Sequence, residues 1–137
     1  MDEKTGETPF HAAARTGSIN AIQWMLENCP NLSPRDKAHN GHTPAHVAAV
    51  YGHMEALKAI LEYNKSKKGL IAAEQDKNGL TILHLAVLQG DDQMVKYILK
   101  QCPHLGFCSN EHGQYPVHFA AASGFLNIIK ILSLIHI

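Results

Sequence analysis

Histidine is the residue whose chemistry first needs an explanation, because the chain of 137 residues holds ten of them. Four recur at near-regular intervals, at His11, His46, His84 and His118. Imidazole is a common metal ligand and general base, but zinc needs its ligand nitrogens about 2.0–2.1 Å away. Side chains that repeat on neighbouring packed helices lie roughly 10 Å apart. The spacing therefore predicts four buried, neutral histidines that bond between turns, and no metal site.

The cysteines of the chain indicate neither a disulfide nor a catalytic site. Cys29 and Cys102 each precede a proline and occupy the same place two repeats apart, at roughly 20 Å, whereas a disulfide needs α-carbons within about 7 Å. With Cys108 the count is odd, as expected for reduced intracellular thiols. The chain also lacks a glycine-rich phosphate loop and the G-x-S-x-G, H-E-x-x-H and C-x-x-C motifs. We expect no catalytic residue, no cofactor and no small-molecule substrate.

Charge and hydropathy narrow the possible partners. Lys plus Arg and Asp plus Glu number 12 each, so the chain has no basic surface for nucleic acid or anionic lipid. No apolar run approaches the roughly 20 residues that span a bilayer. The beginning, MDEKTGETPF, is polar and acidic, unlike a secretory signal. These features predict a cytoplasmic protein that binds neither nucleic acid nor membrane.

The chain repeats one block four times. In each block a histidine follows the first glycine by five residues, an alanine follows it by seven, and a second glycine by eleven. The first glycines are Gly6, Gly41, Gly79 and Gly113. Such self-similarity is the mark of a repeat architecture, in which stacked units bury a shared core.

Each block indicates two helices and a turn. Thr8-Pro9 and Thr43-Pro44 place a capping hydroxyl before a proline, which favours a helix start, and the second glycine ends that short helix. A longer amphipathic helix follows, with an apolar stripe such as Met54, Leu57, Ile60 and Leu61. Polar turns such as Asn40-Gly41 separate the blocks. The predicted fold class is therefore all-α.

The motifs resemble the ankyrin repeat over roughly residues 5–132. The residues that carry the resemblance are Thr8-Pro9-Phe10-His11, Thr43-Pro44-Ala45-His46, Thr81-Ile82-Leu83-His84 and Tyr115-Pro116-Val117-His118. The resemblance implies a solenoid of stacked helix pairs, with turns projecting as hairpin fingers and a concave groove that binds other proteins. We expect a single domain over residues 1–137, with repeats at about 6–40, 41–78, 79–112 and 113–137, the last cut short.

The residues beside the fixed columns are the predicted partner-binding set. They comprise Arg15, Thr16, His39, Asn40, His42, Val50, Tyr51, Lys77, Asn78, Leu80, Leu88, Gln89, Glu111, His112, Gln114 and Ser123. Val50, Tyr51, Leu80 and Leu88 are more apolar than a free surface needs, so we expect a partner's hydrophobic anchor there, although ordinary helix packing would also explain each one singly.

Three departures from the repeat carry their own expectations. Ile82 stands in place of proline and Tyr115 in place of threonine, so we expect the third and fourth caps to be weaker or differently satisfied. The inserted Asn64–Glu74 segment suggests an extended surface loop, whose lysines are either merely solvated or a docking site for an acidic partner. The apolar end, where we expect Ile128, Ile129 and Ile131 to be exposed, predicts an uncapped array that self-associates. Ser133–Ile137 is either part of a truncated repeat, which we favour, or foreign sequence.

The predicted function is a non-catalytic scaffold that binds another protein. The alternative is a targeting segment of a larger cytoskeletal protein or of a multidomain enzyme. Thr43-Pro44-Ala45-His46 is similar to the ankyrin array of the actin-bundling espins, and the spacer before Asp76-Lys77-Asn78-Gly79 is similar to that of synphilin.

Overall fold

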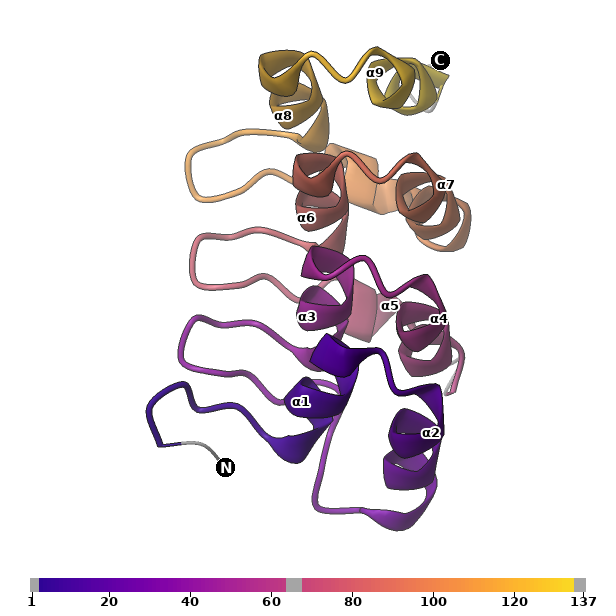
Figure 1. Ribbon diagram of the computed structural model, residues 1–137. Helices are drawn as coiled ribbons and strands as arrows, with labels where there is room; N and C mark the ends of the chain where they lie inside the picture. The colour runs from indigo at the N-terminus through magenta and orange to yellow at the C-terminus, as the bar shows by residue number, and fades with distance from the viewer. Residues whose placement is uncertain (1–2, 64–67, 135–137) are drawn as a thin grey trace.

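The computed structural model describes residues 3–63 and 68–134, and these form helix pairs stacked into one elongated array (Figure 1). An inner column of short helices comprises α1 (Pro9–Thr16), α3 (Pro44–Val50), α6 (Ile82–Gln89) and α8 (Pro116–Ser123). An outer column comprises α2 (Ile19–Asn28), α4 (Met54–Glu62), α7 (Asp92–Gln101) and α9 (Leu126–Ser133). The described residues include no strand, so the predicted all-α solenoid is confirmed.

The inner helices begin at threonines that cap them. The Thr43 hydroxyl accepts a hydrogen bond from the His46 backbone N–H at 3.4 Å, while Nδ1 of His46 accepts from the Thr43 N–H at 3.1 Å. These reciprocal bonds satisfy two helix-start donors that would otherwise lack partners. Thr81 and His84 make the same pair of bonds, so the predicted weakness of the third cap is wrong. The threonine supplies this cap, and the proline that Ile82 replaces is not needed for it.

The fourth cap is weaker, as expected. Tyr115 makes no side-chain capping bond, because a phenol cannot fold back onto the helix start as a threonine hydroxyl does. The other half of the arrangement survives, since Nδ1 of His118 accepts from the Tyr115 N–H at 2.8 Å.

One core runs along the array between the two helix columns. Small alanines such as Ala48, Ala86 and Ala120, each 0% exposed, let neighbouring inner helices approach closely. The outer helices contribute larger side chains, among them Leu57 and Ile98, also 0% exposed. Neither column could bury this surface alone, so stacking of the repeats stabilises helices that are individually too short to persist.

The inserted segment differs from the extended loop that was expected. Residues Lys68–Ala72 form a short helix, α5, that docks Ile71 and Ala72 into the core at 2% and 0% exposure. Nζ of Lys68 donates to Oε1 of Gln101 at 2.7 Å and joins this helix to α7. The helix is favoured because it buries the apolar side chains of Ile71 and Ala72, which an extended surface loop would leave in water. Lys65 and Lys67 lie outside the described residues.

The C-terminal helix is less exposed than its composition suggests. Ile128 is 0% exposed, and Ile129 and Ile131 are half-buried, because α9 turns these side chains towards the preceding repeat. The exposed apolar residues are instead Leu126, at 60%, and Leu134, at 69%. The expectation of three exposed isoleucines is therefore wrong. The Ser133–Ile137 hypothesis falls partly on residues 135–137, which are outside the described part.

After α7 the chain turns through a short 3₁₀ helix, η2 (Pro103–Phe107), before the last finger. Leu105 at its centre is 0% exposed and anchors the turn in the core. Proline at its first position prevents α7 from continuing.

Candidate functional site

The concave face begins with fingers built from backbone hydrogen bonds. Each finger between two repeats is closed by an N–H that donates across its base at 2.9 Å; these bonds run from Ala38 to His42, from Asp76 to Leu80 and from Asn110 to Gln114. Neighbouring fingers are joined by one further bond each, from His39 to Thr5 (2.8 Å), from Lys77 to Asn40 (3.0 Å) and from Glu111 to Asn78 (3.1 Å). The fingers therefore form one continuous wall beside the inner helices (Figure 1).

Buried histidines fix each inner helix to the next finger. Their Nε2 atoms donate to the carbonyl oxygens of the following repeat, from His11 to His42 (2.8 Å), from His46 to Leu80 (3.0 Å) and from His84 to Gln114 (3.2 Å). All three side chains are 0% exposed. His118 is exposed, contrary to expectation, because the described chain places no further finger over it. Three of the four repeat histidines thus bond between turns as predicted.

The histidine bonds require the neutral ring. Nδ1 of His46 accepts from a backbone N–H, so it carries no proton, and Nε2 carries the proton that it donates. Burial lowers the pKa of His11, His46 and His84 below the usual 6.5, although the carbonyl that each ring contacts opposes the shift. The pKa of His46 falls to about 4.

A cavity of about 270 Å³ lies in the groove between the first two repeats. Its lining comprises Thr5, Glu7, Arg15, Ala38, Asn40, His42, Val47, Val50 and Tyr51. Arg15 and Glu7 form an ion pair on one wall. Tyr51 is 55% exposed at the rim, and Val47 and Val50 line the adjoining surface. The cavity therefore combines an apolar surface with paired charges.

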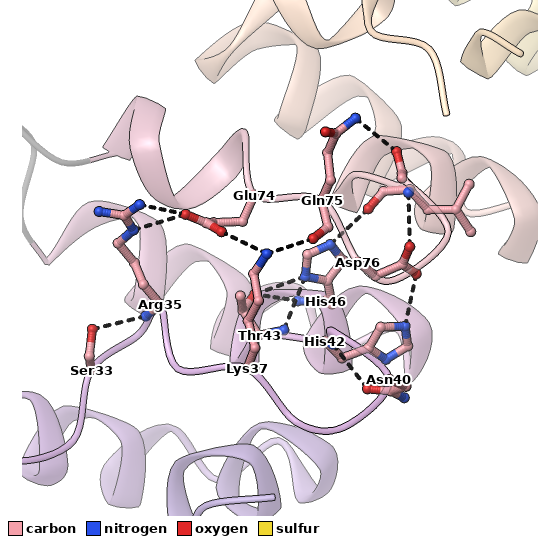
Figure 2. A network of polar contacts seen from close by, with 12 residues as sticks. Ser33, Arg35, Lys37, Asn40, His42, Thr43, His46, Glu74, Gln75 and Asp76 are labelled. Carbon is pink, nitrogen blue, oxygen red and sulfur yellow. Dashed lines mark hydrogen bonds and ion pairs between the residues drawn. The ribbon is translucent and has the colours of Figure 1, made fainter. Parts of the chain in front are cut away.

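His42 forms the opposite wall and is held from the next finger. Its Nε2 lies 3.2 Å from Oδ2 of Asp76, and its ring stacks on His46 with centroids 5.4 Å apart (Figure 2). Asp76 is itself positioned because Oδ1 accepts from the N–H groups of Asn78 and Leu80, both at 2.9 Å. Burial lowers the pKa of His42, while Asp76 opposes that shift.

A charged cluster ties the bases of the same two fingers together. Nε and one terminal nitrogen of Arg35 donate to Oε1 of Glu74 at 2.9 and 2.7 Å, and Nζ of Lys37 lies 3.2 Å from Oε2 (Figure 2). Nζ of Lys37 also donates to the Gln75 carbonyl at 2.9 Å. Although burial alone would raise it, the pKa of Glu74 is lowered because these two cations outweigh that effect. The cluster holds the wall that carries His42 and Asp76.

The structure brings five of the predicted binding residues together around the cavity, namely Arg15, Asn40, His42, Val50 and Tyr51. Leu80 is half-buried against the core. The other predicted residues are exposed away from the cavity, and these are Thr16, His39, Lys77, Asn78, Leu88, Gln89, Glu111, His112, Gln114 and Ser123. Partner binding by any of them stays a prediction.

The prediction omitted several cavity residues. Thr5, Ala38 and Val47 line it, and Asp76 orients His42 from the following repeat. Glu7 also lines the cavity, and its place one residue after the first glycine, in the same column as His42, had already indicated this surface from the sequence.

A larger cavity, of about 390 Å³, lies away from the groove and is lined by residues that include Leu26, Cys29, Tyr63 and Ile71. It adjoins Tyr63, the last described residue before 64–67, and its lining includes Arg35, which pairs with Glu74. Because it lies off the concave face, the groove cavity remains the candidate site. In residues 3–63 and 68–134, no three His, Cys, Asp or Glu side chains are placed to share a metal ion, and Cys29, Cys102 and Cys108 are free thiols. No helix in this part is long and apolar enough to cross a membrane.

The chain is similar to segments of several longer proteins. It is 24% identical over 132 residues to transient receptor potential cation channel subfamily A member 1 of Drosophila melanogaster, covering 96% of this chain and 11% of that protein. It is 31% identical over 119 residues to SMC5-SMC6 complex localization factor protein 1 of Homo sapiens, covering 84% and 11%. An ankyrin repeat-containing protein of Arabidopsis thaliana is 27% identical over 111 residues, covering 78% and 21%. The chain thus spans between a tenth and about a fifth of these relatives.

The family model for ankyrin repeats in three copies matches residues 1–71 and again residues 68–136. Together these matches cover nearly the whole chain and agree with the capped inner helices, the bonded fingers and the histidines between them. The chain belongs to the ankyrin-repeat family.

Proposed function

We propose that this array binds a segment of a partner protein along its concave face, with the cavity beside Tyr51 as the place of the partner's anchoring side chain. Ankyrin repeats generally serve as non-catalytic protein-interaction modules. The observation that carries the more specific proposal is the hollow of about 270 Å³ with an exposed tyrosine at its rim. Exposed aromatic side chains beside concave pockets are typical centres of binding energy.

The walls of the cavity indicate the chemistry of the anchor. Glu7 on one wall is neutralised by Arg15, and His42 on the other wall is uncharged because burial lowers its pKa, so neither wall offers a free charge to a charged side chain. Val47, Val50 and the Tyr51 ring offer apolar surface. An apolar or aromatic anchor with polar neighbours fits this combination, since burial of a charge without a partner is costly.

The partner segment that carries this anchor would extend along the groove towards the third repeat. Leu88 of α6 occupies the position in the third repeat that Arg15 occupies in the first, and it is 39% exposed. Leu80 lies half-buried between the fingers. In this proposal the four repeats at residues 6–40, 41–78, 79–112 and 113–137 act as one domain and one continuous binding surface.

The array would serve as the interaction segment through which a larger protein is targeted, because the matched region is a small part of each relative. Two of these relatives are named as a cation channel subunit and as a localization factor of the SMC5-SMC6 complex. The three free thiols fit a reducing, cytoplasmic setting for the module.

Replacement of Tyr51 and Leu88 by Ala should weaken binding by about 1–3 kcal/mol while leaving the fold intact, because both side chains are exposed and support little of the core. The probe is a peptide selected from a random display library on the wild-type protein, and its dissociation constant is measured by calorimetry. The matched control is Tyr63→Ala, which removes an equally exposed tyrosine (53% against 55%) from the outer side. Unchanged affinity in the double variant, with an unchanged circular dichroism spectrum, would show that the groove is not the binding surface.

A further inference from the structure

One position of the outer helices holds a large side chain in three repeats and a small one in the second. Eighteen residues after the first glycine stand Trp24, Tyr97 and Ile131, whereas Ala59 occupies this position in α4. The difference matters between α2 and α4, which pack as neighbours in the outer column (Figure 1).

Tyr97 shows what a large side chain does at this position. Its hydroxyl donates to Oε1 of Glu62 at 3.0 Å, and Nζ of Lys58 lies 5.4 Å from the centroid of its ring. Both partners belong to α4, the outer helix of the preceding repeat. Burial and the Glu62 carboxylate raise the pKa of Tyr97, so the phenol keeps the proton that it donates.

A hollow of about 360 Å³ lies at the equivalent place between α2 and α4. In the first repeat, Gln23 is the counterpart of Lys58, and Glu27 is the counterpart of Glu62. The hollow therefore has the surroundings of the Tyr97 ring without the ring itself. We call it the outer hollow, and it is lined by Gln23, Leu26, Glu27, Ala59, Glu62 and Tyr63.

The outer hollow is acidic. Glu27 has no hydrogen-bond or ion-pair partner within the described part of the chain, and Glu62 brings a second carboxylate. Gln23 is neutral where Lys58 provides a cation one repeat later, and no Lys or Arg is among the residues that line the hollow. Positive charge beside a bound aromatic ring is therefore favoured here, and negative charge is opposed.

The outer hollow continues towards the larger cavity of about 390 Å³, because Leu26 and Tyr63 line both. That cavity adds apolar surface from residues that include Leu32, Ile60 and Ile71. An extended segment that places an aromatic side chain in the hollow thus finds apolar surface for the next side chain. A peptide segment uses both surfaces, whereas a free phenol would use only the first.

We propose that the outer hollow receives an unphosphorylated tyrosine from a basic segment of a partner protein, with an apolar residue next to that tyrosine. The phenol ring would lie against Ala59, and its hydroxyl would donate to Glu27, as Tyr97 donates to Glu62 within the chain. A phosphate on this tyrosine would meet two carboxylates, so phosphorylation would prevent binding.

This site is independent of the proposed groove binding. The outer hollow is lined by outer helices alone, whereas the groove cavity is lined by fingers and inner helices. The array would therefore hold two partner segments at once, one on each column.

Ala59→Tyr tests the shape of the outer hollow without any ligand. The new phenol should fill the hollow and donate to Glu27, so the urea midpoint of unfolding should rise, and adding Glu27→Ala should remove part of that gain. The control is Ala122→Tyr, which adds a tyrosine at an exposed position of α8 and should leave the midpoint nearly unchanged. An unchanged or lower midpoint in Ala59→Tyr would show that the hollow does not accept a tyrosine and would overturn the proposal.

Binding is tested with the peptide acetyl-Lys-Lys-Tyr-Leu-Lys-Lys-amide, titrated into isotope-labelled protein and followed by NMR. We expect amide shift changes at Gln23, Glu27 and Ala59. Ala59→Tyr should weaken binding at least about tenfold because it occupies the hollow, and Glu27→Ala at least about threefold. Glu55→Ala removes the same charge from a 65% exposed position of α4 outside the hollow and should bind like the wild type.

Two variant peptides identify the group that is recognised. Alanine or phosphotyrosine in place of tyrosine should each lower the affinity at least about tenfold. Equal affinity for the tyrosine and alanine peptides would mean that only the lysines bind, and an absence of shift changes around the hollow would mean that the site takes no tyrosine; either result overturns the proposal. The groove peptide should bind with unchanged affinity in the presence of this probe, so the two sites succeed or fail separately.

Discussion

Acidification from about pH 7.5 to about pH 5.5 should lower the free energy of unfolding by more than about 1 kcal/mol. The loss comes from His11, His46 and His84, which are buried and bonded as neutral rings. With a folded pKa of about 4 against about 6.5 unfolded, His46 alone accounts for about 1 kcal/mol of the loss.

The sign of this effect follows from proton binding. Below the unfolded pKa of about 6.5, the unfolded chain binds protons that the folded histidines resist, so acid favours unfolding. The stability that these rings contribute is complete above that pKa and is lost as pH falls towards their lower folded pKa. Glu74 affects stability in a lower pH range than the histidines. The pKa of its carboxylate lies below the usual 4.5, so the stability that it contributes is lost only as the pH falls through that lowered pKa.

Urea denaturation at the two pH values measures the loss, and a His46→Gln/His84→Gln variant identifies its source. That variant should be less stable at the higher pH but lose less on acidification than the wild type. His112→Gln is the control, since its side chain is 72% exposed, and it should keep the wild-type pH dependence. An equal pH dependence in the double variant and the wild type would show that other groups titrate.

Gly41→Ala should destabilise the fold by more than about 3 kcal/mol, while Gly113→Ala should cost only about 1–2 kcal/mol. Both glycines are left-handed, with φ of 84° and 73°, so both changes share the backbone strain of an L-residue there. A Cβ on Gly41 would lie 2.4 Å from the backbone nitrogen of Lys77 in the next finger, whereas one on Gly113 meets no atom within 4 Å.

The difference between the stability losses of the two variants measures the contribution of the close approach of one finger to the next. Thermal and urea unfolding of both proteins provide the comparison, with Gly113→Ala as the matched control for strain. Similar losses in the two variants would mean that the second finger moves aside and that finger packing contributes little to stability.

The sequence predicted features that belong to one repeat better than features formed between repeats. The threonine caps and the helix starts follow from residues three places apart, so they could be derived locally. The pairing of His42 with Asp76 crosses 34 residues and depends on the register of two fingers, which column spacing alone does not specify. For the same reason the cavity was predicted only through some of its lining residues.

The errors have physical causes of the same kind. His118 occupies the same place in its repeat as His84, but its burial depends on a finger outside its own repeat. Ile128 seemed exposed because α9 is apolar on several sides, and only packing against α7 determines which side is covered. The short helix α5 was missed because Ile71 and Ala72 are buried by other elements, among them α4, rather than within their own segment.

An NMR titration of isotope-labelled protein with the selected peptide tests the proposed groove most directly, because amide shifts report the bound surface residue by residue. We expect the largest shift changes at the cavity and along the inner column, at Asn40, Val50, Tyr51 and Leu88. The amides of Trp24 and Tyr63, on the outer column, should change little. Shift changes concentrated on α2, α4 and α7, with the cavity residues unaffected, would contradict partner binding by the concave face.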